Sequence, residues 1–248
     1  MAKNKELKIF GLTLDSLTAE QVLTKIKETA KPLWIVTANP EILLEARRDK
    51  TYADILRQAD LRLVDGFGIQ LMATLCSYRV HRVPGVDLAE KIVDLAAQQG
   101  WRVGLFGGGV LKSAQPAADV LRQKYPNIQI MAENGGRVDN QGSDDAIGEE
   151  ARHRMIMFAP EVLLVALGHP KQDRWIVNHA ADFPGLKVII GLGGTFDYWA
   201  GAIKRAPLWM RQIGLEWLWR LFVEPKRIKR ILNAVFVFPA CYLRDLVF

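Results

Sequence analysis

Six short apolar runs recur along the first 200 residues, and each has the length of a buried β-strand. The run VLLVAL (162–167) has no polar residue at alternate positions, which is typical of a strand covered on both faces in a parallel sheet. The pattern therefore predicts one buried sheet. Its strands are expected at residues 33–38, 61–64, 101–106, 128–131, 162–167 and 187–192.

Amphipathic stretches with helix start and stop signals lie between these runs. One follows a capping box that begins at Thr18, a second covers about 86–99 and stops at Gly100, and a third covers about 110–124. Alternation of strands and helices predicts an α/β fold with a doubly wound, mainly parallel sheet. We expect a catalytic domain over residues 1–200 and a helical C-terminal appendage over residues 201–248.

The last 48 residues differ from the rest of the chain in charge. Segment 201–248 has nine basic and three acidic residues, so it holds the whole net charge of +6. Pro207 predicts the start of a helix that runs to Glu224, and Pro225 ends that helix. In residues 226–235, basic and apolar side chains fall on opposite arcs, which favours an amphipathic helix lying on an anionic membrane surface. A solvated helix face and a nucleic-acid contact are the alternatives.

Other features of the sequence bear on location. Cys76 and Cys241 are too few for a disulfide framework, and the start MAKNKELKIF lacks the apolar core of a signal peptide. Both observations predict a cytosolic, reducing location. The uncharged stretch 231–243 is shorter than the roughly 20 apolar residues of a membrane-spanning helix, so we expect attachment to a membrane without a span.

Polar residues follow several predicted strands directly. In open α/β sheets, ligands bind beyond the carboxyl ends of the strands, so these residues are candidates for a site. Asp65 is a candidate general base, although Asp-Gly is also a common turn dipeptide. Asn39-Pro40 has the pattern of a helix N-cap, which is the stronger interpretation of that pair alone. The candidates at strand ends are Thr37, Asn39, Asp65, Gly107, Gly108, Gln172, Thr195 and Asp197.

Cofactor motifs fit this sequence poorly. The glycines that start at Gly107 can approach a phosphate through backbone N–H groups, but Lys112 stands where a dinucleotide-binding fingerprint needs glycine. The sequence has no Walker loop, no H-E-x-x-H, no Cys/His cluster and no Asp-x-Asp pair. We therefore expect no cofactor and no metal site. A bound diphosphate would then rely on arginines, lysines and helix N-termini.

Several motifs occur in an order that resembles a known family. They are TANPEILLEA (37–46), LVDGFGI (63–69), RVPGVDL (82–88), LFGGG (105–109), VALGHPKQDRWI (165–176) and the long block 190–230. The chain resembles the WecG/TagA/CpsF family of glycosyltransferases over nearly its whole length. The resemblance implies a Rossmann-like α/β domain whose C-terminal appendage helps to close the active site at the cytoplasmic face of the membrane.

The resemblance also implies a reaction. It is the inverting, metal-independent transfer of N-acetylmannosamine from a UDP donor to N-acetylglucosamine linked to polyprenyl diphosphate. Asp65 matches the general base, and Thr37 and Asn39 match residues that orient sugar and acceptor. Gln172 and Asp197 match donor-pocket positions. In the appendage, the candidates for binding diphosphate are Arg220, Arg227 and Arg230. The further candidates for substrate binding are Gly107, Gly108, Thr195 and Arg205.

Alternatives stay open at this point. The same fold with another UDP-sugar, such as UDP-N-acetylmannosaminuronic acid or UDP-glucose, would serve capsule or exopolysaccharide assembly. A nucleotide- or nucleic-acid-binding module with a basic tail is an alternative of a different class. His169 and Asp173 depart from residues that related sequences often carry, which leaves the donor sugar open. The sequence also leaves open whether the protein forms a homo-oligomer.

Overall fold

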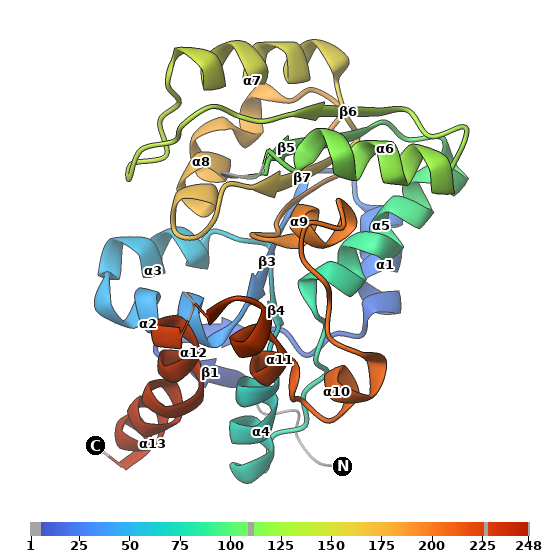
Figure 1. Ribbon diagram of the computed structural model, residues 1–248. Coiled ribbons are helices and arrows are strands. Elements are labelled where there is room, and N and C mark those ends of the chain that lie inside the picture. Colours follow the sequence, from blue (N-terminus) through green and yellow to red (C-terminus); the bar gives the residue numbers. More distant parts are fainter. Residues whose placement is uncertain (1–5, 109–111, 226–227, 248) are drawn as a thin grey trace.

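The fold is a layered α/β structure, seen in a computed structural model that describes residues 6–108, 112–225 and 228–247 (Figure 1). Six parallel strands form one sheet in the order β4-β3-β8-β7-β5-β6. The predicted Rossmann-like, doubly wound sheet is therefore confirmed. Its strands are β3 (Leu33–Ala38), β4 (Leu61–Val64), β5 (Val103–Gly107), β6 (Ile130–Glu133), β7 (Val162–Ala166) and β8 (Val188–Gly191).

A small antiparallel hairpin precedes the sheet and was not predicted. Its strands β1 (Leu7–Ile9) and β2 (Leu12–Leu14) have three residues each, too few for a reliable sequence pattern. The turn between them uses Phe10 and Gly11, which both have positive φ. The leucines and isoleucine of the hairpin are buried, so it covers the sheet core.

Helices cover both faces of the sheet (Figure 1). One core lies between the sheet and α1, α5, α6 and α9, and the other lies beneath α2, α3, α4, α7 and α8 together with the β1–β2 hairpin. The predicted capping box at Thr18 is present, and α5 ends at Gly100 in the left-handed region as expected. The helices of the first 200 residues are α1 (Ala19–Glu28), α2 (Pro40–Arg48), α3 (Lys50–Arg57), α4 (Phe67–Leu75), α5 (Gly85–Gln99), α6 (Ala114–Lys124), α7 (Ala146–Phe158), α8 (Lys171–His179), the short η2 (Ala180–Asp182) and α9 (Thr195–Trp199).

The first predicted helix of the tail is broken in two. The expected single helix over 207–224 is instead α10 (Leu208–Gln212) and α11 (Glu216–Val223). Gly214 separates them with a φ of 80°, and a Cβ at this position would lie 2.2 Å from the ring of Phe67. Close contact with α4 therefore fixes a left-handed glycine where the apolar pattern alone predicts a continuous helix.

The rest of the tail continues as α12 (Ile228–Leu232), the π-helical turn η4 (Asn233–Val237) and α13 (Phe238–Val247). Pro239 has no N–H to donate to the preceding turn, which suits the wider π-helical spacing before it. Phe238 is fully buried in the same core cluster as α2 and α4. The start of α13 is thus packed into the body of the molecule. Among the helices of the described residues, none is both long enough and apolar enough to cross a bilayer.

Candidate active site

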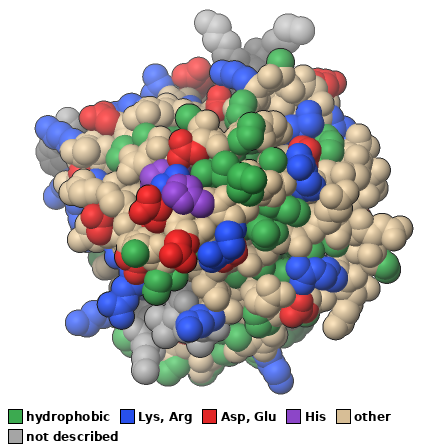
Figure 2. All heavy atoms as spheres, turned by 90° about the horizontal axis from the view of Figure 1, so that it is seen from above, with side chains coloured by type: hydrophobic (Ala, Val, Ile, Leu, Met, Phe, Trp, Pro, Cys, Tyr) green, Lys and Arg blue, Asp and Glu red, His purple; other side chains and the backbone are tan. Residues whose placement is uncertain are grey.

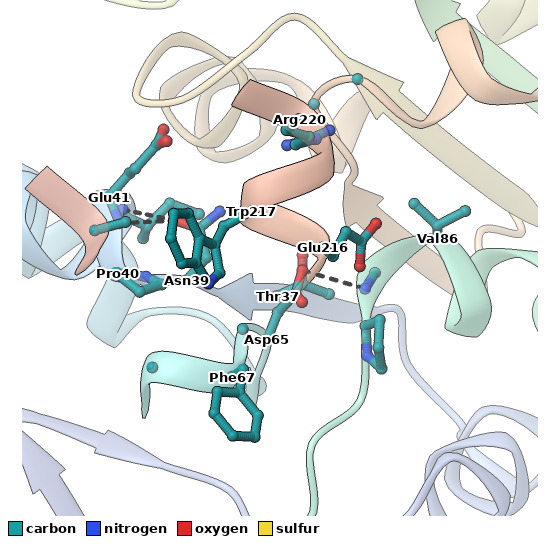
Figure 3. A pocket seen from close by; sticks show the side chains of 18 of the residues that line it. Thr37, Asn39, Pro40, Glu41, Asp65, Phe67, Val86, Glu216, Trp217 and Arg220 are labelled. Atoms are coloured by element: carbon teal, nitrogen blue, oxygen red, sulfur yellow. Dashed lines mark hydrogen bonds between the residues drawn. The ribbon is translucent and has the colours of Figure 1, made fainter. Parts of the chain in front are cut away.

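A cavity of about 410 Å³ lies at the carboxyl ends of β3, β4 and β8. Residues that follow these strands form one wall, and α11, α12 and η4 of the tail form the opposite wall (Figure 3). The structure thus brings the strand-end candidates and the tail arginines to one place. Eight predicted site residues line it: Thr37, Asn39, Asp65, Gln172, Thr195, Arg205, Arg220 and Arg230.

Asp65 lies at the point where β4 ends. Its backbone N–H donates to the Ala38 carbonyl at 2.8 Å, and its Oδ2 accepts from the N–H of Gly85, the first residue of α5, at 3.3 Å. Gly66 follows with a φ of 102°, so the chain turns sharply into α4. Sheet and helix therefore hold this carboxylate from two sides in the cavity wall (Figure 3).

The environment of Asp65 favours its protonated form more than water does. Burial raises the pKa of Asp65 to about 6, and the negative charge of Glu216 adds to the increase. The Gly85 N–H and the positive charges of Arg82 and Arg220 act in the opposite direction and lower the pKa. The resulting pKa lies close to neutrality, which suits a group that accepts a proton during a reaction.

Thr37 near the end of β3 and Asn39 directly after it lie beside Asp65 (Figure 3). The Thr37 hydroxyl is buried and donates to the Gly191 carbonyl at 3.4 Å, which ties β3 to β8. Asn39 is the N-cap of α2, because its Oδ1 accepts from the N–H groups of Glu41 and Ile42, each at 3.0 Å. The N-cap interpretation of Asn39 is confirmed, and the cap also places its amide group in the cavity wall.

Gln172 and Thr195 shape the turn after β8. Gln172 is 3% exposed, and its Oε1 accepts from the Gly193 N–H at 3.2 Å. The Thr195 hydroxyl donates to the Leu192 carbonyl at 3.0 Å. The Gln172 amide packs directly against Gly191. A Cβ at position 191 would lie 2.5 Å from the Gln172 side chain, so a larger residue there would displace this amide. Both side chains support the cavity wall through these bonds.

Arginines from the tail carry positive charge to the opposite wall. The Arg220 guanidinium donates to the Tyr198 hydroxyl at 2.5 Å and lies over the same ring. Arg205 pairs with Asp87 at 2.5 Å, and its Nε lies 3.7 Å from Glu216. These contacts orient both cations at the cavity, where a bound diphosphate would find charged donors.

At another part of the rim, Arg230 connects the tail to α2. Its Nε donates to Glu41 Oε2 at 2.8 Å, and His169 Nε2 lies 3.7 Å from the same oxygen. All three side chains line the cavity. Arg227, also predicted to bind diphosphate, lies outside the described residues.

Three predicted residues lie outside the cavity lining. Gly107 is the last residue of β5 and Gly108 follows it, and β7 separates this strand from β8. The Ser113 hydroxyl lies within hydrogen-bond distance of both the Gly108 carbonyl (3.1 Å) and Asp197 (2.7 Å). The two glycines have φ values of 111° and 105°, and a Cβ at Gly107 would lie 2.5 Å from the Ala166 carbonyl oxygen. The tight turn therefore explains both glycines, and their role in substrate binding stays a prediction, as does that of Asp197.

Several cavity residues were not predicted. Arg82 pairs with Val64 in a short parallel bridge, and its guanidinium donates to the Arg211 carbonyl at 2.9 Å. Its place in the motif RVPGVDL is a signal that could have identified it. Glu216 and Trp217 open α11, and their apolar surroundings in the sequence gave no sign that this turn faces a cavity.

Within residues 6–108, 112–225 and 228–247, no group of three or more His, Cys, Asp or Glu side chains is arranged to hold a metal ion.

Comparison with known proteins identifies the family. Residues 7–247 match the model of the glycosyl transferase WecG/TagA/CpsF family. The chain belongs to this family. A relative from Staphylococcus aureus strain MRSA252, named N-acetylglucosaminyldiphosphoundecaprenol N-acetyl-beta-D-mannosaminyltransferase, is 33% identical over 229 residues, which cover 90% of this chain and 87% of the relative. The protein of the same name from strain NCTC 8325 / PS 47 is 34% identical over 231 residues, with the same coverage.

The predicted resemblance to the WecG/TagA/CpsF family is thus confirmed, and this protein is a glycosyltransferase. The motifs that carried the resemblance are far apart in the sequence. Four of them, at 37–46, 63–69, 82–88 and 165–176, contribute side chains to the cavity, and so does the block 190–230. Most of the family signature therefore lies in the cavity wall, and the described part of the motif LFGGG, residues 105–108, contributes no lining residue.

Proposed function

We propose that this glycosyltransferase moves N-acetylmannosamine from UDP to N-acetylglucosamine on a polyprenyl diphosphate. The observation that carries the proposal is Asp65, a carboxylate with a pKa of about 6 in a cavity that also holds Arg82 and Arg220. The names of the Staphylococcus aureus relatives, which describe this sugar transfer to a diphosphoundecaprenol-linked acceptor, support the choice of sugar and acceptor.

In the proposed reaction, Asp65 accepts the proton of an acceptor hydroxyl as that oxygen attacks the anomeric carbon of the donor sugar. The bond between this carbon and the UDP oxygen breaks on the opposite face, so the anomeric configuration inverts. UDP leaves with the electron pair of that bond. Arg82, Arg205 and Arg220 supply positive charge in the cavity for the departing diphosphate, which is the proposed basis for transfer without a metal ion.

A donor screen tests this proposal. Purified protein would be given a lipid-diphosphate N-acetylglucosamine acceptor and one UDP-sugar at a time, in the presence of EDTA, with UDP release as the measurement. We expect release that depends on the acceptor and is fastest with UDP-N-acetylmannosamine. Release only with UDP-N-acetylmannosaminuronic acid or UDP-glucose would replace the proposed donor. Loss of release in EDTA, with recovery on adding Mg²⁺, would overturn the metal-independent reaction.

We further propose that the protein attaches peripherally to the inner face of the cell membrane through its tail. Trp209, Phe222 and Phe236 are 59%, 75% and 64% exposed, and large exposed apolar side chains favour contact with lipid. The opposite end of the molecule, near α7 and α8, shows acidic and basic side chains around apolar ones (Figure 2). Several are paired there, as Arg152 is with Asp144 and Asp182.

Binding to anionic vesicles tests the membrane proposal. The double variant Trp209→Ser/Phe222→Ser should co-sediment with phosphatidylglycerol vesicles on the order of tenfold less than the original protein. Ile147→Ser/Met157→Ser, which removes exposed apolar residues from α7, is the matched control. Equal binding of all three proteins would exclude the tail as the contact. Deleting the tail is a poorer test, because buried Phe238 belongs to the core.

A further inference from the structure

Part of the cavity lining is apolar and has no role in the proposed sugar transfer. It comprises Leu71 and Met72 of α4, Val235 of η4 and Pro239 of α13. The apolar parts of a UDP-N-acetylhexosamine are the faces of the uracil ring and the acetyl methyl group, and it has no alkyl chain that could follow these side chains out of the cavity.

The apolar surface continues from the cavity to the outside along two helices. On α4, Leu71 is 45% exposed, and Leu75, one turn further on, is 69% exposed. On α13, the positions four and seven residues after Pro239 are Leu243 and Leu246, which are 50% and 53% exposed. Residues four and seven apart share one helix face, so each helix carries an apolar stripe that starts at the cavity.

These two helices are neighbours. Both begin at the cavity, and Tyr242 of α13 contacts Cys76 at the end of α4, where burial and this contact raise the pKa of the Tyr242 hydroxyl. Met72 and Phe238 belong to the same core cluster between them. In Figure 1, α4 and α13 extend from the same end of the molecule. The two stripes thus flank one apolar path that leads out of the cavity.

We propose that this path binds the first isoprene units of the acceptor's polyprenyl chain, with Leu71, Met72, Val235 and Pro239 as its walls inside the protein. The inference rests on the proposed function, in which the acceptor is a lipid diphosphate. Arg230 lines the same cavity, where it is paired with Glu41, and is the cation that we assign to the diphosphate at the start of the chain. Sugar, diphosphate and lipid then contact successive parts of one continuous site.

The recessed position of Met72 distinguishes binding of a single prenyl chain from contact with a bilayer surface. Met72 is 3% exposed although it lines the cavity, so a flat membrane surface cannot reach it. A flexible prenyl chain can enter, and its burial removes apolar surface from water. The path therefore fits one lipid chain, while the exposed Leu75 and Leu246 lie where that chain would leave the protein.

The test compares two water-soluble acceptors without vesicles or detergent. N-acetylglucosamine diphosphate would carry either a methyl or a farnesyl group, and kcat/KM would be measured for each below the aggregation limit of the farnesyl compound. We expect the original protein to prefer the farnesyl acceptor by about tenfold or more, mainly through KM. Leu71→Asn and Val235→Asn should each reduce this preference to about threefold or less.

Ile147→Asn, an exposed apolar position on α7, is the matched control and should keep the full preference. Thermal unfolding of each variant shows whether it is folded. Because the two variants lie on different helices, one of them still tests the proposal if the other does not fold. Equal kcat/KM for the two acceptors in the original protein would overturn the proposal. A preference that appears only when vesicles are added would also overturn it, in favour of bilayer contact.

Calorimetric binding of farnesyl diphosphate and methyl diphosphate tests the path separately from turnover. If no acceptor is glycosylated but farnesyl diphosphate binds about tenfold more tightly, and Leu71→Asn removes the difference, the proposed function fails and the lipid path stands. If acceptors are glycosylated but neither binding nor kcat/KM depends on the prenyl group, the lipid path fails and the proposed function stands.

Discussion

The two walls of the cavity are built in different ways. The strand-end wall, which comprises Thr37, Asp65 and Gln172, is held by backbone hydrogen bonds and buried neighbours of the parallel sheet. The tail wall presents Glu216 and Arg220 from the short helix α11, which has no buried residue and is fixed mainly by side-chain contacts. The difference indicates that the two walls have separate roles. The sheet positions the proton acceptor, and the tail supplies charge around it.

The largest effect on turnover is expected for Asp65→Asn, which changes the strand-end wall. The amide cannot accept the proton of the acceptor hydroxyl, so kcat should fall by about 10² to 10⁴, while UDP binding stays within about threefold. Steady-state kinetics and calorimetry measure the two quantities. Asp54→Asn, at an exposed carboxylate on α3, is the matched control. If kcat of Asp65→Asn stays within threefold of the original value, the base is another group.

Changing the tail wall should have a smaller effect. Arg220→Gln removes a cation near the departing diphosphate, so kcat/KM should fall by about 10 to 10², and UDP should bind more weakly as well. Arg220→Lys keeps the charge and should recover part of the loss. Arg122→Gln, on the surface of α6, serves as the control. An unchanged kcat/KM in Arg220→Gln would remove the tail from the reaction.

A smaller effect is expected from Glu216→Gln, which changes the charge near Asp65 and leaves the proposed base in place. Asp65 acts as a base only when ionised, so kcat should rise with pH through its pKa of about 6. Glu216 raises that pKa, and Glu216→Gln should therefore move the acid limb of the pH profile to lower pH. The ratio of variant to original activity should then be higher at pH 5.5 than at pH 8. A limb that does not move, or moves upward, contradicts the coupling between the walls.

The smallest effect on turnover is expected behind the strand-end wall. Asp173 is buried, accepts from the Tyr52 hydroxyl at 2.6 Å, and does not line the cavity. Burial raises its pKa from 3.8 to about 7, so the folded protein retains a proton that the unfolded chain releases. Its contribution to the free energy of unfolding is present below pH 4 and is lost as the pH rises through 7.

Asp173→Asn should remove this pH dependence, because an amide does not titrate. The difference in Tm between variant and original protein should grow from pH 5 to pH 8 in favour of the variant, and kcat should change by less than about threefold. Thermal unfolding across this pH range measures it. Parallel Tm curves for the two proteins would show that Asp173 does not titrate between these pH values.

Much of the strand-end wall could be predicted from the sequence. Apolar runs without alternation indicate buried parallel strands, and such strands place the residues after them at one sheet edge. The local sequence pattern therefore pointed to Thr37 and Asp65, which both line the cavity. It could not exclude Gly107 and Asp197 from the cavity, because the order β4-β3-β8-β7-β5-β6 decides which strand ends are adjacent, and strand order is not encoded in local pattern.

The tail shows the limit of the same reasoning. Local pattern indicated helices, basic charge and an apolar surface in residues 201–248, since these depend on composition and spacing alone. The break at Gly214 depends on the ring of Phe67, nearly 150 positions earlier in the chain, and the electrostatic effect of Glu216 on Asp65 likewise joins residues far apart in the sequence. The sequence by itself determined the elements and their chemical character, whereas tertiary packing decided which of them meet, because contacts between distant segments are set by the shape of the folded core.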